Sequence, residues 1–387
     1  MRAVKTLHHL LRSSLVVIHT ARVKSVFWAV LSLLHGSRLS LTGLGRSARG
    51  PVLTKHNIKR VDRLLKNAKL HKEQSVFYRV IAALLIGGKK RPVIIVDWTG
   101  IGTKHSALVA AVPIDGRAVP IYIRVYSYKL NNNTTVEKRF LKKLKGILPA
   151  GCRPIIVTDA GFRNAWFRAV LDLGWDFVGR VMSRAHACPS KNGKWRSTHA
   201  VFEKAIFSAK DLGSWLLARS NPLKLRFVII KNRPTGRKTK RIGVKGDVEA
   251  RKRAQKPWLL ATSLFSSTPK KITRIYSVRF QIEESFRDTK NPRFGWSFRY
   301  ARSRDNNRIE ILLLIATLGI LSLMLVGQTA ERHGIHRSFQ ANTVQSKRVL
   351  SLFFLGKNVI QIEMDKTFLV SDYLLSIKNL KDKSLCL

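Results

Sequence analysis

Two apolar segments that each end in an aspartate constrain the fold of this chain most strongly. Residues 93–97 read Val-Ile-Ile-Val-Asp and are followed by Trp98, and residues 154–159 read Pro-Ile-Ile-Val-Thr-Asp. Short apolar runs of this kind are typical of buried strands. Between them, residues 107–114 and 118–126 are two more apolar runs, joined through an Asp-Gly pair that favours a hairpin turn. The segment therefore begins as one acidic strand followed by a hairpin.

The rest of this region predicts helices that alternate with strands. We expect a helix over 134–148 before the second acidic strand, another over 161–173, and a strand over 176–181. An acidic strand, two hairpinned strands, a helix and a second acidic strand follow one another in a ribonuclease-H-like sheet. The fold class is thus α/β, with a ribonuclease-H-like domain.

A polar stripe marks a long helix expected to begin at Pro269 and to end at Asn291-Pro292. Tyr276, Arg279, Glu283 and Lys290 follow one another at spacings of three, four and seven residues. At ~100° per residue, all four would lie within ~60° of one meridian of a helix. A carboxylate able to bind metal would then be flanked by groups able to bind phosphate, which suits cleavage of a nucleic-acid backbone.

Two neighbours of the stripe have weaker claims to a role. Glu284 competes with Glu283 but lies ~100° away around the helix. Arg287 projects near the stripe, where it would either contact phosphate or serve as a surface charge.

The aspartates at the strand ends complete a set of three carboxylates. Ligands in open α/β sheets bind at strand ends, where Asp97 and Asp159 would converge. Ionised carboxylates held close together repel one another unless a cation lies between them. With Glu283 they offer hard oxygen donors suited to Mg²⁺ or Mn²⁺, and two such ions can catalyse phosphoryl displacement without a covalent nucleophile. A single aspartate after a strand is often only a turn or helix cap, so the prediction depends on all three.

The charge of the chain points to a polyanionic partner. The 387 residues include 72 Lys and Arg against 22 Asp and Glu, a formal net charge of +50. Such a surface binds nucleic acid by releasing counterions. A ribosomal or nucleoid coating protein is the alternative. However, a chain of this length that is 45% hydrophobic can form the cores of two or three domains.

Basic residues concentrate in the N-terminal region. Residues 1–90 contain 18 Lys and Arg against 2 Asp and Glu, with apolar residues at helical spacing. Residues 54–66 predict a helix with an apolar stripe and a basic face, and residues 39–49 a short helix and turn. We interpret the region as a helical DNA-binding domain, with a solvated helical cap as the alternative. The basic face consists of Lys55, Lys59, Arg60 and Arg63.

A second basic segment interrupts the order of strands and helices. Residues 190–256 contain 19 Lys and Arg against 4 Asp and Glu, a β-like run at 225–231 and a turn-rich basic loop at 233–241. We interpret it as an inserted β-rich subdomain facing DNA; the alternative is a partly disordered linker. Trp258 opens the next strand, over 258–262, and would by default be a core residue.

Other features limit the compartment and the cofactors. Residues 311–327 lack charge but are short for a bilayer crossing, so we expect a buried core helix and no membrane partner. Three cysteines without a CxxC pair fit a reducing compartment, and charged residues interrupt any signal-peptide core. We therefore expect a cytoplasmic, nucleoid-associated protein. The chain has no GxxxxGK[ST] loop, and Gly100-Ile-Gly102 lacks the third glycine of a dinucleotide loop, so no nucleotide cofactor is expected.

The polar stripe resembles the signature of a known family. Tyr276, Arg279, Glu283 and Lys290 match without a gap the Y-(2)-R-(3)-E-(6)-K signature of insertion-sequence family four among bacterial DDE transposases. The segments ending in the two aspartates resemble the blocks that contain the family's first two catalytic acids. The resemblance extends from about residue 40 to 350, and it includes residues 54–65, 256–262 and 340–344.

The resemblance implies cut-and-paste transposition. Hydrolysis would free the transposon 3′ end, the 3′-OH would form a hairpin with the opposite strand, water would reopen it, and the 3′-OH would join target DNA. The metal ligands would be Asp97, Asp159 and Glu283. Family members act as homodimers on terminal inverted repeats and target DNA. Tyr276, Arg279 and Lys290 would bind phosphates near the transposon end, and Trp258 would stack on a flipped base.

Five segments follow from these inferences. We expect a transposon-end-binding domain over 1–90, a catalytic domain in two parts over 91–189 and 258–330, the insertion over 190–257, and a helical C-terminal region over 331–387 as a candidate dimerisation region. Similarity fades after about Val349. Two alternatives remain: a ribonuclease-H-like nuclease without strand transfer, and an inactive DNA-binding copy.

Overall fold

The computed structural model describes residues 1–182, 184–189, 193–231, 256–341, 343–344 and 346–387. They form two compact units, one of residues 1–152 and 280–387, the other of residues 153–279. The basic loop predicted over 233–241 lies outside the described residues. The five-part division of the chain stays a prediction.

A three-stranded antiparallel sheet lies at one side of the first unit. Its strands are β1 (Val93–Ile101), β2 (His105–Ile114) and β3 (Arg117–Ser127), in the order β3-β2-β1. Asp115 and Gly116 join β2 to β3 with φ of 48° and 85°. Positive φ at both central residues is the geometry of the tight hairpin turn that Asp-Gly favours. The predicted acidic strand and hairpin are therefore confirmed.

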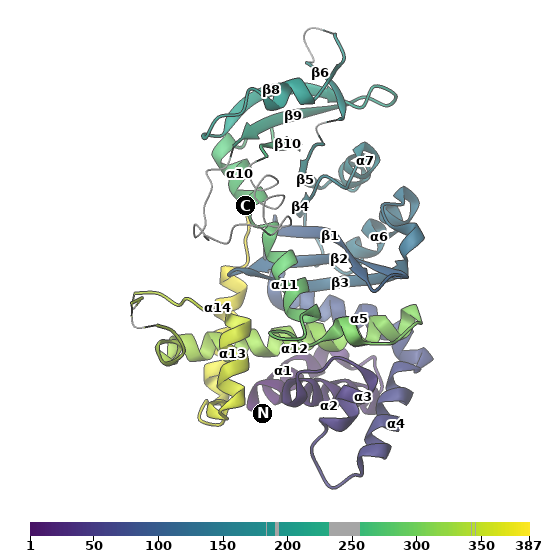
Figure 1. Cartoon of the computed structure of the whole chain (residues 1–387), viewed down its shortest axis with the longest axis vertical. Coiled ribbons are helices and arrows are strands. Elements are labelled where there is room, and N and C mark those ends of the chain that lie inside the picture. The colour runs from purple at the N-terminus through teal and green to yellow at the C-terminus, as the bar shows by residue number, and fades with distance from the viewer. Residues whose placement is uncertain (183, 190–192, 232–255, 342, 345) are drawn as a thin grey trace, which may run out of the picture. The chain divides into compact units, whose positions relative to one another are not determined.

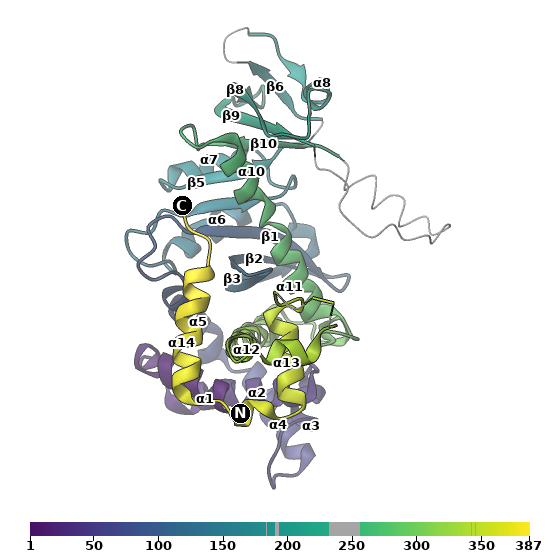
Figure 2. The same cartoon turned by 90° about the vertical axis from the view of Figure 1, so that its left-hand side faces the viewer.

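The longest helix of the first unit, α12 (Asn306–Arg332), lies between this sheet and the helices from both ends of the chain (Figure 1, Figure 2). Its apolar stretch would be long enough to cross a membrane, yet the whole of that stretch is buried inside the protein. The predicted core helix is thus confirmed. Around it pack β3 and the helices α1 (Arg2–Arg12), α2 (Thr20–Gly36), α4 (Thr54–Leu65), α5 (Ala68–Ile86), α13 (Leu352–Gln361) and α14 (Val370–Lys383).

One buried carboxylate ties α12 to the sheet. Glu310, 1% exposed, accepts the Val125 backbone N–H of β3 at 2.9 Å and pairs with Arg124 at 3.0 Å. Burial raises the pKa of Glu310, and the Arg124 guanidinium opposes that shift. Burying an unpaired carboxylate costs several kcal/mol of folding free energy. The backbone donor and the guanidinium offset that cost for Glu310.

Two helices cover opposite faces of the sheet. Helix α11 (Phe280–Lys290) packs on it through Ser285, whose Oγ accepts the Ala118 N–H at 2.9 Å. On the other face, Trp98 Nε1 donates to Glu137 of α6 (Thr134–Lys145) at 3.0 Å. The shorter elements of this unit are α3 (Leu41–Arg46) and the 3₁₀ helices Ser13–Leu15, Tyr128–Leu130, Phe298–Tyr300, Ile335–Phe339 and Met364–Lys366.

The second unit is built on one mixed sheet. Its strand order is β4-β5-β10-β9-β8-β6-β7, with β4 and β5 parallel and the other neighbours antiparallel. The strands of the predicted insertion therefore continue this sheet through the pairing of β9 with β10. The elements are β4 (Ile155–Thr158), α7 (Asn164–Asp172), β5 (Asp176–Arg180), β6 (His186–Pro189), β7 (Arg196–Ser197), α8 (His199–Phe202), β8 (Lys210–Leu217), β9 (Leu223–Ile230), β10 (Trp258–Thr262) and α10 (Pro269–Ser277).

The single long helix predicted from Pro269 to Lys290 is wrong. The chain forms α10 and α11 instead, with a turn at Val278 and Arg279 between them. The Arg279 N–H bonds to the Tyr276 carbonyl at 3.0 Å, an i→i−3 bond that tightens the last turn of α10. Ser277 Oγ donates to the Arg274 carbonyl at 2.7 Å, which competes with the helical bonding pattern. The four signature residues therefore do not share one helical face.

Helices α12 and α13 approach so closely that only glycine fits at their contact. A Cβ on Gly327 would lie 2.0 Å from the Leu352 carbonyl oxygen, and one on Gly356 would lie 2.0 Å from the Leu323 carbonyl oxygen. Real Cβ atoms do not approach backbone this closely, so the crossing depends on both glycines.

We expect Gly356→Ala to destabilise the protein by about 1–3 kcal/mol, because the added methyl group overlaps a backbone atom that cannot swing aside. The midpoint of urea unfolding, followed by circular dichroism, measures the change. Gly146→Ala is the matched control, because a Cβ there meets its nearest neighbour at 3.6 Å. Equal midpoints for the two variants would contradict the packing argument.

Candidate active site

The prediction that Asp97 ends its strand is wrong, because β1 continues to Ile101 through its pairing with β2. Asp97 lies near the middle of β1 and is 9% exposed. Its Oδ1 accepts the N–H of Trp98 at 2.9 Å. Because side chains alternate along a strand, Asp97 and Thr99 point to the same face, the one on which α11 packs. Trp98 points to the opposite face and bonds to α6. The strand therefore presents the carboxylate toward α11.

Lys290 at the end of α11 lies beside this carboxylate. Its Nζ donates to Thr99 Oγ1 at 2.5 Å. Burial lowers the pKa of Lys290 to about 8, and the negative charge of Asp97 opposes the shift. Burial has therefore already removed part of the water around this ammonium group. Two of the predicted site residues are thus brought together in the first unit.

Glu283 lies two turns before Lys290 on α11, so the two residues share a helical face. Its side chain is exposed. The competing Glu284 is instead half-buried, with its carboxylate 3.7 Å from the Arg117 guanidinium and bonded to Arg287. The ion pairs of Glu284 account for that residue structurally, and the selection of Glu283 as the third acid stays a prediction.

The second unit groups Asp159 with two other predicted residues. Asp159 follows β4 directly, and its Oδ1 accepts the Gly161 N–H at 2.8 Å. Burial raises the pKa of Tyr276; the charges of Arg279 and Arg180 lower it, and that of Asp159 raises it, so these groups lie within electrostatic range. The ring of Trp258 meets that of Tyr276 edge to face, with centroids 4.9 Å apart.

Arg180 belongs to this group, although the sequence analysis did not select it. It ends β5, which runs parallel to β4 with Thr158 opposite Gly179, so Arg180 and Asp159 end adjacent strands at the same edge. Its Nη2 donates to the Pro257 carbonyl at 3.2 Å, one residue before Trp258. The sequence did contain a signal for this residue. Arg180 is a cation near the end of a strand that was expected beside the acidic strand.

The predicted residues divide between the two units. Asp97, Glu283 and Lys290 lie in the first unit, and Asp159, Trp258, Tyr276 and Arg279 in the second. Within the residues that the structure describes, no three His, Cys, Asp or Glu side chains gather into a group able to hold a metal ion. The metal role of the three acids stays a prediction.

A basic groove of about 1090 Å³ lies in the first unit. It begins at the β1–β2 turn, includes Lys290 and Arg287, and contains no aspartate or glutamate among its lining residues. Such a lining suits a polyanion. Four further cations line the groove and were not predicted from the sequence: Lys104, Arg299, Arg302 and Arg304. The basic run after the signature was a signal for the three arginines.

The basic face predicted for residues 54–66 is present on α4. Lys55, Lys59 and Arg63 are exposed, and the Arg60 guanidinium lies over the Trp28 ring at 4.1 Å from its centroid. This cation–π contact anchors Arg60 against α2, which leaves the other three cations in solvent. On the opposite side of α4, Val61, Leu64 and Leu65 are buried and Ile58 is half-buried.

Comparison with known proteins shows the family of this chain. The family model described as Transposase DDE domain matches residues 88–320, which is more than half of the chain. The match includes both aspartates, Trp258, and the whole of α10 and α11. A comparison with curated proteins found no match. Transposases of this kind act on DNA and generally use divalent metal ions. The chain belongs to the family of transposases with a DDE domain.

Proposed function

We propose that the chain is a cut-and-paste transposase of insertion-sequence family four, similar to the transposase of the tetracycline-resistance composite transposon. One observation supports this most strongly. The family match over 88–320 contains, in order, two aspartates that end or lie on strands, followed by the ungapped Tyr276, Arg279, Glu283 and Lys290 signature.

In this proposal Asp97, Asp159 and Glu283 are the metal ligands. Their carboxylate oxygens are hard donors that fit Mg²⁺, with Mn²⁺ as a substitute, and do not fit a zinc site built from nitrogen and sulfur. The bound ions would activate an attacking oxygen and stabilise a leaving one. Asp97 and Glu283 belong to the first unit and Asp159 to the second.

The cations of each unit would bind the DNA backbone around that phosphate. Lys290 beside Asp97, and Arg180 and Arg279 near Tyr276, would contact phosphates next to the scissile one. Arg287 and the basic groove would bind the strand further along. The four transfers are 3′-end hydrolysis, hairpin formation, hairpin opening and joining to target DNA. Each breaks one phosphodiester bond and makes one P–O bond.

Trp258 would act in the hairpin step. It opens β10 and is only partly buried, with its ring against Tyr276. A hairpin forces one strand to bend sharply, and a base flipped from the stack loses a few kcal/mol that an aromatic platform partly returns. Tyr276 would fix the orientation of this platform.

The partners follow from the same proposal. The terminal inverted repeats would bind the basic face of α4, through Lys55, Lys59, Arg60 and Arg63, and the protein would act as a homodimer on paired ends in the bacterial cytoplasm. A ribonuclease-H-like nuclease without strand transfer is the alternative that product analysis separates. Nicked ends without joined products would favour the nuclease.

The carboxylate prediction concerns Asp97, Asp159 and Glu283. We expect Asp97→Asn, Asp159→Asn and Glu283→Gln each to reduce cleavage of labelled transposon ends in Mg²⁺ by about a thousandfold or more, since several kcal/mol of charge stabilisation are lost. End binding, measured by gel shift, should remain. Glu284→Gln is the control on the same helix, with an expected change below about fivefold because its role is an ion pair. Full cleavage by any of the three variants would remove that residue from the site.

The Trp258 prediction separates hairpin formation from the first nick. We expect Trp258→Ala to lower the hairpin yield by about 5–150-fold, the equivalent of ~1–3 kcal/mol of stacking, while nicking continues. Denaturing gels resolve the two products. Trp258→Phe keeps an aromatic face and should retain most hairpin product. Equal losses of nicking and hairpin in Trp258→Ala would show a structural role instead.

The groove prediction uses the salt dependence of DNA binding. The logarithm of the DNA-binding constant falls linearly with the logarithm of the salt concentration. Removing two phosphate contacts makes this negative slope shallower by about 1.8 for duplex DNA. We expect this change for the pair Arg302→Ala and Arg304→Ala, measured by fluorescence anisotropy. The pair Lys142→Ala and Lys145→Ala removes the same charge from exposed positions on α6 and should leave the slope nearly unchanged. Identical slopes for both pairs would exclude the groove from the DNA path.

A further inference from the structure

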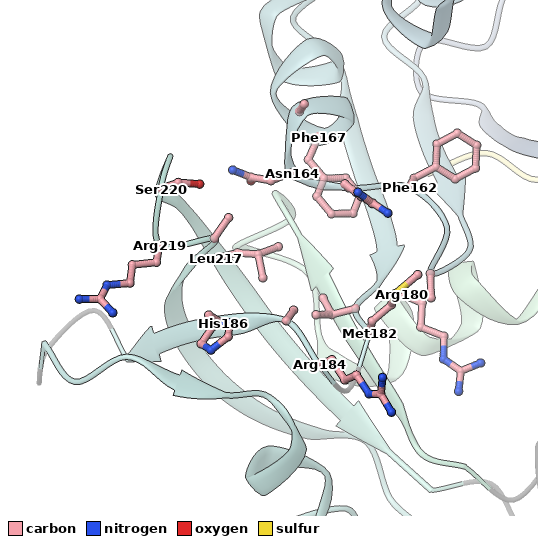
Figure 3. A pocket seen from close by; sticks show the side chains of 16 residues that line it. Phe162, Asn164, Phe167, Arg180, Met182, Arg184, His186, Leu217, Arg219 and Ser220 are labelled. Carbon is pink, nitrogen blue, oxygen red and sulfur yellow. The ribbon is translucent and has the colours of Figure 1, made fainter. Parts of the chain in front are cut away.

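A cavity of about 880 Å³ lies in the second unit, and of its lining residues only Arg180 has a role in the steps above. It lies between the start of α7, the segment that follows β5, and the turn between β8 and β9 (Figure 3). Neither Trp258 nor Tyr276 lines it. The cavity is therefore distinct from the aromatic platform proposed for a flipped base.

Hydrogen bonds fix the walls of this cavity. Asn164 Nδ2 donates to the Asn221 carbonyl at 2.6 Å, and Arg168 donates to the same oxygen at 3.2 Å, which joins α7 to the β8–β9 turn. The N–H of Ala218 donates to the His186 carbonyl at 2.9 Å, which joins the turn to β6. The three walls are thus held together before any ligand binds, as is usual for binding sites.

The floor of the cavity is apolar. Phe167 stacks on Phe177 at 4.4 Å and, like Leu217, is buried, so this surface is rigid. Met182 is 48% exposed and lies over the same floor, between the arginines in Figure 3. A thioether is adaptable and makes favourable contacts with aromatic rings. The floor would accept a planar ring.

The rim of the cavity is cationic. Arg163, Arg180, Arg184 and Arg219 line it, and no aspartate or glutamate does. Within the described part of the chain, Arg184 and Arg219 pair with no carboxylate at ion-pair distance and are exposed, so both can bind an anion without breaking an existing pair. Guanidinium groups bind phosphates and stack on nucleobases. An apolar floor within a ring of guanidinium groups matches a nucleotide.

The cavity is continuous with the Asp159 group. Ala160, the residue after Asp159, lines it, and Arg180 both lines it and acts electrostatically on Tyr276. A strand with one phosphate beside Asp159 would need only a short extension to enter the cavity. Duplex DNA is too wide for a cavity of this volume, so the occupant would be unpaired.

We propose that this cavity binds a nucleotide of single-stranded DNA, with its base against Met182 and Leu217 and its flanking phosphates on Arg184 and Arg219. The strand is the unpaired one that passes Asp159, so the assignment rests on the proposed function. Transposon ends opened for hairpin formation provide such a strand. The chemistry is sequence-tolerant, since every base has a face to stack.

The test measures binding without catalysis. Asp97→Ala protein is mixed with a single-stranded oligonucleotide that contains one 5-iodouracil, irradiated, and digested, and the crosslinked peptide is identified by mass spectrometry. We expect crosslinks within residues 160–186 or 215–220. Anisotropy with the same oligonucleotide measures affinity at several salt concentrations. Because cleavage is not measured, failure of the proposed catalytic role would leave this result interpretable.

Two pairs of variants make the test specific. The double variant Arg184→Ala with Arg219→Ala should lose the crosslink. The slope of log affinity against log salt for single-stranded DNA should become shallower by about 1.4, because two phosphate contacts at ~0.7 each are lost. Arg196→Ala with Lys224→Ala removes equal charge from exposed positions outside the cavity and should change neither. Met182→Ala should reduce the crosslink but not the slope. Crosslinks confined to other peptides, or unchanged binding of an abasic oligonucleotide, would overturn the proposal.

Discussion

The first unit depends on the complete burial of α12. A helix that is apolar on all sides is stable in water only if other elements enclose it. Here the hairpin sheet, the N-terminal helices and the C-terminal helices together supply that enclosure. Glu310 adds a directional bond from α12 to the backbone of β3. The strand that contains Asp97 is therefore positioned by residues about two hundred positions later in the chain, and an error in that packing would move the carboxylate.

The second unit uses a different constraint, the shared edge of two parallel strands. Because β4 and β5 run in the same direction, the residues that follow them emerge together. That edge combines the carboxylate of Asp159 with the guanidinium of Arg180, and the buried phenol of Tyr276 lies in the same electrostatic surroundings. Opposite charges at one edge suit a phosphate group. The cation can contact its oxygens, and a carboxylate could hold a metal ion near its reacting atoms. The cavity beyond Arg180 extends this edge away from the aromatic pair.

The secondary structure was largely predictable because local patterns determined it. The two apolar runs became β1 and β4, although β1 continues four residues beyond Asp97, and the Asp-Gly pair adopted the positive φ values that its chemistry allows. The stripe on 54–66 became the buried side of α4. The signature helix was predicted wrongly as one piece, since periodicity cannot detect a single i→i−3 bond at Arg279. Arg180 and the groove arginines were missed because their neighbours are remote in sequence, and the choice of Glu283 over Glu284 by its angle on the helix stays a prediction.

The sequence by itself determined which residues could do chemistry: three acids, a cationic signature and a charge of +50 follow from composition and spacing. It also determined the strands and helices, because side-chain periodicity is a local property of the backbone. Only the tertiary structure decided how these elements are grouped. The assignment of the acids to two units and the arginine-rimmed cavity depend on packing between distant segments. Spacing along a chain contains no information about such contacts.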